Sequence, residues 1–151
     1  MTIEWDNTLE TGDPLVDLQH ERIHRTFHEL LHAEDTPGEI MRVLDRLTVH
    51  VAAHFATEED LMEREAFPPH LAELHRVEHA RLTESTREIV LSFHRGELTS
   101  TAPIVDFLRD WLSTHVHQCD RILIEHVQSR GGAAELPEPW ASSPPPETLA
   151  S

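Results

Sequence analysis

The chain has 151 residues, which suits one domain built around one hydrophobic core. Its formal charge of −16 at pH 7 argues against nucleic acids and anionic membrane surfaces as partners, because both are negatively charged. No apolar run is long enough to cross a bilayer, the first residues lack a secretory pattern, and the one cysteine excludes an internal disulfide, so we expect a cytoplasmic protein.

The first predicted elements are an arm and two helices. Residues 1–16 form the arm, which is expected to lie along the rest of the fold. Apolar residues then recur at intervals of three and four over residues 16–31, a pattern typical of an amphipathic helix. The pattern is interrupted at Pro37-Gly38 and resumes over residues 40–62, which predicts a second helix.

Two further helices follow in the sequence. Pro68-Pro69 separates the second helix from a third apolar stripe over residues 71–93, and Gly96 can adopt the left-handed conformation that ends this helix. A fourth stripe covers residues 104–123, with Pro103 near its first turn. The residue that caps this fourth helix is expected to be Ser100 or Thr101.

The arrangement of these elements predicts the fold class. Short loops between long helices make successive helices antiparallel, so we expect an all-α protein with an up-down-up-down four-helix bundle. The bundle with its arm is expected to span residues 1–131. Residues 132–151 are rich in Pro and Ser and are expected to form a flexible tail.

Ionisable side chains fall on the apolar stripe of every predicted helix. In chain order they are His20; His54 and Glu58; His75 and His79; and His115. A polar group buried without a partner costs about 1–3 kcal/mol, so this many inward imidazoles need a common partner. Any one pair is more often a surface pair or a hydrogen-bonded core histidine. Taken together, the residues predict a metal site, because imidazole and carboxylate are good ligands for first-row metals.

The order and spacing of these residues resemble those of the hemerythrins, specifically the single-domain bacteriohemerythrins. The residues that carry the resemblance are His20, His54-x-x-x-Glu58, His75-x-x-x-His79 and His115-x-x-x-x-Asp120. The flanking sequences also agree: Trp5, TGDPLVDLQH at 11–20, HFATEEDLM at 54–62 and WLSTHVHQCD at 111–120. The resemblance covers about residues 3–125 and leaves out the tail.

The resemblance implies a cofactor of two non-haem iron ions joined by an oxo or hydroxo bridge. It assigns three histidines to one iron, two histidines to a second iron that keeps an open position, and two bridging carboxylates to both. The implied ligands of the first iron are His75, His79 and His115, and those of the second iron are His20 and His54. The implied bridging carboxylates are Glu58 and Asp120.

The resemblance also implies that dioxygen binds reversibly at the open position, so we expect an oxygen carrier, store or sensor. An apolar pocket would exclude water there, and the residues that would line it, besides packing the core, are Leu82, Trp111, Leu112 and Val116, with Phe55 and Met62 nearby. The alternative is an enzyme with oxidase, peroxidase or nitric-oxide-handling activity. Five imidazoles with only two carboxylates favour reversible binding over oxidation.

The fourth helix leaves two candidates for its second ligand. Regular helical geometry places Cys119 one turn after His115. Asp120 follows His115 by five residues, so it lies about 140° from His115 around the helix. The resemblance favours Asp120, and so does the need of a two-metal site for bridging carboxylates. A widened, π-type turn near residues 115–120 would reconcile the five-residue spacing with an inward Asp120.

Three further residues are candidates for indirect roles at the site. Asp17 precedes His20 by three residues and can either orient that ligand or cap the first helix. His24 and His50 each lie one turn from a ligand, where a proton path, an auxiliary metal contact or partly exposed packing are the alternatives. We expect the protein to be a monomer or a weak homo-oligomer.

Overall fold

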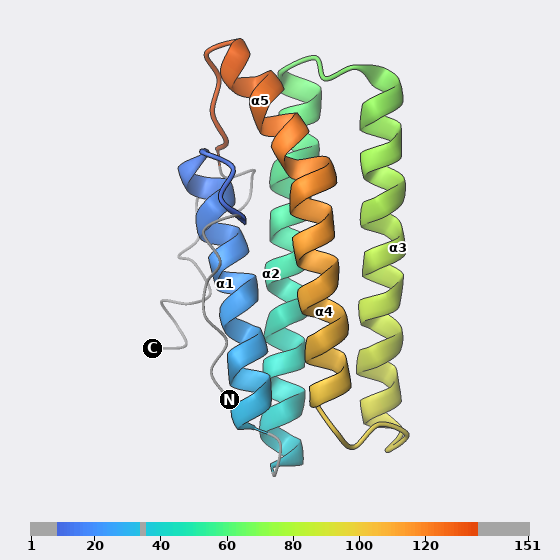
Figure 1. Ribbon diagram of the computed structural model, residues 1–151. Coiled ribbons are helices and arrows are strands. Elements are labelled where there is room, and N and C mark those ends of the chain that lie inside the picture. Colours follow the sequence, from blue (N-terminus) through green and yellow to red (C-terminus); the bar gives the residue numbers. More distant parts are fainter. Residues whose placement is uncertain (1–8, 34–35, 136–151) are drawn as a thin grey trace.

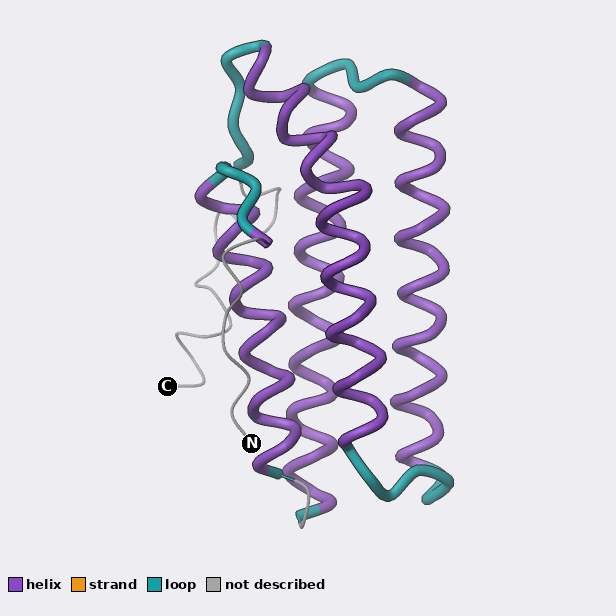
Figure 2. Tube along the Cα trace, viewed as in Figure 1, coloured by secondary structure: helices purple, strands orange, loops and turns teal. Residues whose placement is uncertain are grey.

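The computed structural model describes residues 9–33 and 36–135, which form four antiparallel helical columns (Figure 1). The first three columns are α1 (Pro14–His32), α2 (Pro37–Arg64) and α3 (Pro69–His94). The fourth is a continuous run of α4 (Ala102–His115), the π-helix η2 (Val116–Asp120) and α5 (Arg121–Ser129). Figure 2 shows that the described residues are helix and loop without a strand. The expected all-α four-helix bundle is therefore confirmed.

α1 begins at Pro14, inside the stretch expected to form the arm. Asp13 is the N-cap residue, and its carboxylate accepts hydrogen bonds from the backbone N–H groups of Leu15 and Val16 at 3.0 and 3.1 Å. Pro14 occupies the first helical position, where its missing N–H costs nothing. The helix therefore starts earlier than the apolar pattern alone indicates.

The predicted breaks lie at the ends of the helices. Pro37 and Pro69 each begin a helix, and Gly96 follows α3 with φ of +72°, the left-handed conformation that glycine adopts without strain. Thr101 is the N-cap residue of α4, but its side chain makes no capping hydrogen bond. Thr101 thus occupies the predicted cap position without the expected side-chain contact.

The buried apolar residues form two clusters with a polar layer between them. The larger cluster includes Phe27, Leu47 and Leu108, and the smaller one includes Leu61 and Leu123. On each helix the predicted ligands fall where the chain passes from one cluster to the other: His20 lies between Val16 and Ile23, and Asp120 between Val116 and Leu123. The core therefore supports the site from both sides along the bundle axis.

Both ends of the chain extend beyond the described residues. Residues 1–8, which belong to the expected arm, and residues 136–151, which belong to the expected flexible tail, lie outside them. The described part of the tail is joined to the start of α1, because the N–H of Ala134 donates to the carboxylate of Asp13 at 2.8 Å. No helix in the described part of the chain is long and apolar enough to span a bilayer.

Candidate metal centre

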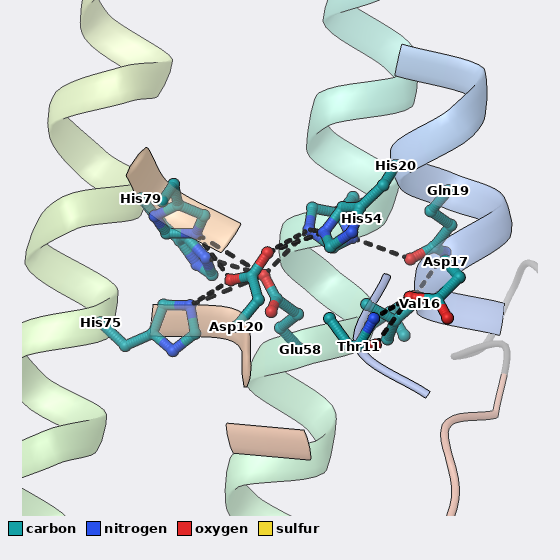
Figure 3. A network of polar contacts seen from close by, with 12 residues as sticks. Thr11, Val16, Asp17, Gln19, His20, His54, Glu58, His75, His79 and Asp120 are labelled. Atoms are coloured by element: carbon teal, nitrogen blue, oxygen red, sulfur yellow. Dashed lines mark hydrogen bonds and ion pairs between the residues drawn. The ribbon is translucent and has the colours of Figure 1, made fainter. Parts of the chain in front are cut away.

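All seven predicted ligands meet in the polar layer of the bundle. Each of these residues is at most 3% exposed. Figure 3 shows His75 and His79 approaching from α3 and His20 and His54 from the opposite side, with the carboxylates between them. Ligand atoms close enough to share an ion form two groups, which are Glu58, His75, His79, His115 and Asp120, and then His20, His54 and Asp120.

The two oxygens of Asp120 face different histidines. On one side, Oδ2 lies 2.7 Å from Nε2 of His20 and 3.3 Å from Nε2 of His54. On the other side, Oδ1 lies 3.1 Å from Nε2 of His75 and 2.9 Å from Nε2 of His115. A carboxylate that offers one oxygen to each of two histidine groups is placed as a bridge between two ions.

Glu58 lies beside Asp120 but turns one oxygen, rather than two, toward the histidines. Its Oε1 lies 3.1 Å from Nε2 of His54 and 3.2 Å from Nε2 of His79. It therefore also contacts one histidine from each group. The centre thus contains five imidazoles around two carboxylates, with each carboxylate facing both histidine groups.

The π-helix η2 accounts for the position of Asp120. A π-turn adds one residue to the helical turn, so Asp120, five residues after His115, points inward and is 0% exposed. Cys119 is half-buried and belongs to neither group of potential ligand atoms. The π-type turn expected from the spacing is confirmed, and the structure brings Asp120 rather than Cys119 to the centre.

Burial and mutual pairing shift the pKa values of the histidines and carboxylates at the centre. Burial opposes protonated imidazole, but the neighbouring carboxylates outweigh it, raising the pKa of His54 and of His75 to about 9 and that of His115 to about 12. Burial alone would raise the pKa values of the two acids, but the neighbouring histidines outweigh it. The pKa values of Glu58 and Asp120 are therefore held well below their usual range. For His79, burial dominates and lowers the pKa. The two buried carboxylates therefore require positive charge around them.

Several atoms at the centre fit metal ions better than they fit one another. Nε2 of His20 and Nε2 of His54 lie only 3.0 Å apart. Oε2 of Glu58 and Nδ1 of His115 are buried without a hydrogen bond in the described part of the chain. Buried polar groups normally have partners, so these atoms are arranged for an ion. Imidazole and carboxylate together suit first-row metals.

These pKa values predict how the chelated, metal-free protein responds to pH. Its folded state binds protons on His54 and His75 more tightly than the unfolded chain, whose imidazoles titrate near 6.5. The resulting stabilisation is complete below about pH 6.5 and is lost as pH rises through about 9. Thermal unfolding at pH 6.5, 8 and 9 should therefore show a falling Tm. The iron-loaded protein should change less, because metal already holds its ligands deprotonated; a constant or rising Tm of the metal-free protein would contradict the prediction.

The sequence of the bundle matches a known domain family. Residues 11–127 match the family described as the hemerythrin HHE cation binding domain. The chain belongs to the hemerythrin family.

Individual relatives and solved structures agree with this assignment. A bacteriohemerythrin of Ralstonia nicotianae is 30% identical over 131 residues, which cover 85% of this chain and 91% of the relative. A bacteriohemerythrin of Methylococcus capsulatus is 31% identical over 66% of this chain and 79% of the relative. A crystal structure of wild-type hemerythrin has a TM-score of 0.73 and 26% identity, covering 81% of this chain and 95% of that one.

Family membership confirms the cofactor and the general function expected from the sequence. Hemerythrins bind dioxygen at a di-iron centre, and the histidine and carboxylate cluster of this hemerythrin-family protein suits such a centre.

Gln19 is a residue of the site that the sequence did not reveal. Thr57 donates its hydroxyl to the carbonyl of Ala53 at 3.0 Å and must accept from the amide of Gln19 at 2.9 Å. The oxygen of Gln19 therefore faces Nδ1 of His54 at 3.0 Å, so Nδ1 carries the proton. This contact directs the lone pair of Nε2 of His54 into the centre. The signal that the sequence offers is the position of Gln19 directly before His20.

The three residues expected to act indirectly have other surroundings. The carboxylate of Asp17 accepts hydrogen bonds from Thr11 and Gly12, so it orders the loop before α1 and does not orient His20. His24 and His50 are 5% and 7% exposed, so both are buried rather than partly exposed, as the packing alternative had expected. Their participation in a proton path or a metal contact stays a prediction.

Aromatic rings cover one side of the centre. Phe55 stacks on His79 with ring centroids 3.9 Å apart, and Trp111 stacks on His115 at 5.5 Å. The four predicted pocket residues belong to or pack against the larger apolar cluster: Leu82, Trp111, Leu112 and Val116. Met62 belongs instead to the smaller cluster, so it does not join them. Apolar and aromatic groups thus border the centre on the side of the larger cluster.

Proposed function

We propose that this protein binds dioxygen reversibly at a di-iron centre, at the iron that His20 and His54 would hold. His75, His79 and His115 would hold the second iron, with Glu58 and Asp120 as the carboxylates between the two histidine groups. The observation that supports this division is the position of Asp120, whose Oδ2 faces His20 and His54 while its Oδ1 faces His75 and His115.

The two irons supply the electrons and the coordination position that dioxygen binding needs. The protein contributes orientation and exclusion of water. Gln19 keeps a proton on Nδ1 of His54, so that Nε2 is available to the metal. Phe55, Trp111 and the neighbouring aliphatic side chains keep water from the aromatic side of the centre. A dry pocket favours release of unchanged oxygen over loss of a partly reduced product.

The ligand set separates this proposal from the enzyme alternative. The centre has five imidazoles and two carboxylates, whereas di-iron oxidases in related bundles use more carboxylates. Anaerobic loading with Fe(II), followed by air and then argon, tests the proposal. An absorption band that appears in air and disappears under argon supports a carrier, store or sensor. Irreversible oxidation with turnover on added reductant would establish an enzyme instead.

Enlarging one pocket residue should slow autoxidation. Leu82 is 8% exposed in α3 and belongs to the larger apolar cluster. In Leu82→Phe the larger ring should fill space beside the centre and hinder water, so the oxygen-bound protein should persist several-fold longer. Leu74→Phe is the matched control, because Leu74 lies on the same helix but is 62% exposed. Equal decay of the oxygen-bound absorption in both variants would remove Leu82 from the pocket.

The surroundings in which the protein works are also proposals. We propose the cytoplasm, where a chain whose one cysteine, Cys119, is unpaired has no need of an oxidising compartment. We also propose a monomer or a weak homo-oligomer. Cell fractionation tests the first proposal, and light scattering over a range of protein concentrations tests the second.

A further inference from the structure

A second pair of histidines lies along α1, away from the metal centre. His28 and His32 are one helical turn apart, and their ring centroids are separated by 4.2 Å with an interplanar angle of 51°. His28 follows His20 by eight residues, which places it about 12 Å further along the helix axis. Neither residue belongs to the groups of ligand atoms at the di-iron centre.

The pair borders a cavity between α1 and α2. This cavity has a volume of about 330 Å³ and is lined by His28 and His32 together with the carboxylates Glu29 and Glu39. Nδ1 of His28 is buried and has no hydrogen-bond partner among the described residues. A buried ring nitrogen without a partner is unfavourable, and an ion in the cavity would remove that cost.

The C-terminal end of α1 favours a cation at the cavity. His32 lies in the last turn of α1, where the helix dipole stabilises positive charge. Glu29 is paired with Arg46, which also lines the cavity and offsets the charge of Glu29. Glu39 pairs with Arg42 at 2.8 Å, but these side chains are 46% and 73% exposed, so the pair is weak and Glu39 can turn to another cation.

We propose that His28 and His32 form a second metal site, which binds one divalent ion of the zinc, nickel or copper class. Two imidazoles at this helical spacing can chelate one ion, and imidazole selects these metals over magnesium and calcium. Water completes the coordination, and Glu39 lies in the lining of the same cavity. The site is independent of the di-iron centre and of the oxygen binding proposed for it.

Zinc titration of the iron-loaded full chain tests the proposal. Isothermal calorimetry should detect one zinc site per chain, and metal analysis afterwards should show that iron is retained. His28→Ala and His32→Ala should each weaken zinc binding at least about tenfold, because each removes one arm of the chelate. His70→Ala is the matched control, since His70 is exposed and has no histidine four residues away. Its affinity for zinc should equal that of the wild type.

Three results would overturn the proposal. The first is a wild-type protein that binds no zinc below about 1 mM, which would leave only adventitious contact. The second is unchanged affinity in His32→Ala, whose exposed position makes it the variant expected to fold normally. The third is an equal loss of affinity in His70→Ala. Thermal unfolding of each iron-loaded variant verifies that the fold is intact before titration.

Discussion

Replacing Asp120 by Asn should remove at least one of the two irons from each chain, whereas Cys119→Ser should keep both. Asp120 offers Oδ2 to His20 and His54 and Oδ1 to His75 and His115, so its loss affects both halves of the centre. Cys119 is half-buried and belongs to neither group of ligand atoms. Iron content per folded chain, measured after Fe(II) loading and gel filtration, distinguishes the two variants.

The same pair of substitutions should also differ after the metal has been removed. Asp120 is buried among imidazoles whose pKa values its charge helps to raise, so Asp120→Asn leaves positive charge without its partner. Breaking a buried ion pair in this way costs about 3–5 kcal/mol of unfolding free energy. Denaturant unfolding of the chelated variants measures the loss. Two irons in Asp120→Asn together with fewer in Cys119→Ser would show that the thiol is the ligand.

Gln19→Leu should weaken metal binding about 10- to 100-fold, which is the usual effect of removing a group that orients a metal ligand. Oε1 of Gln19 accepts a hydrogen bond from Nδ1 of His54 at 3.0 Å, and Nε2 of Gln19 donates to the hydroxyl of Thr57 at 2.9 Å. Leucine has a similar volume but no acceptor, so the Nδ1 proton of His54 would be buried without a partner at a cost of about 1–3 kcal/mol. The rate of iron release to a chelator is the direct measurement.

A conservative variant separates orientation from packing at this position. Gln19→Glu keeps an oxygen that can accept from Nδ1 of His54, so iron release should be slower than in Gln19→Leu. A role in packing alone would make Gln19→Leu the milder change, because Gln19 is only 6% exposed and an apolar side chain suits that position. Iron release from Gln19→Leu at the wild-type rate would therefore rule out the orienting role.

The helices and the candidate histidine ligands follow from local features of the chain. Apolar spacing of three and four marks the four columns, and Pro37, Pro69 and Gly96 mark their limits, because backbone constraints at proline and glycine act within one or two residues. His20, His54, His75, His79 and His115 fall on the apolar stripes, so helical geometry is enough to direct them inward. Their place in one family motif then indicates the di-iron centre and its oxygen chemistry.

Asp120 marks the limit of that local information. Regular helical spacing selects Cys119, and the π-helix that turns Asp120 inward serves contacts with three other helices, the one to His20 spanning 100 residues of sequence. Asp17 shows the same limit in reverse, since proximity in sequence suggested His20 but its hydrogen bonds go to Thr11 and Gly12.

The amino-acid sequence by itself determined the all-α bundle, the candidate ligands on its stripes and the family, because these depend on residue type and short-range spacing. Only the tertiary structure decided how the two oxygens of Asp120 are divided, that Gln19 orients His54, and that His28 and His32 share a cavity with Glu39. These features depend on the register between packed helices. That register is set by side-chain packing across the whole core, so no single segment of the sequence contains it.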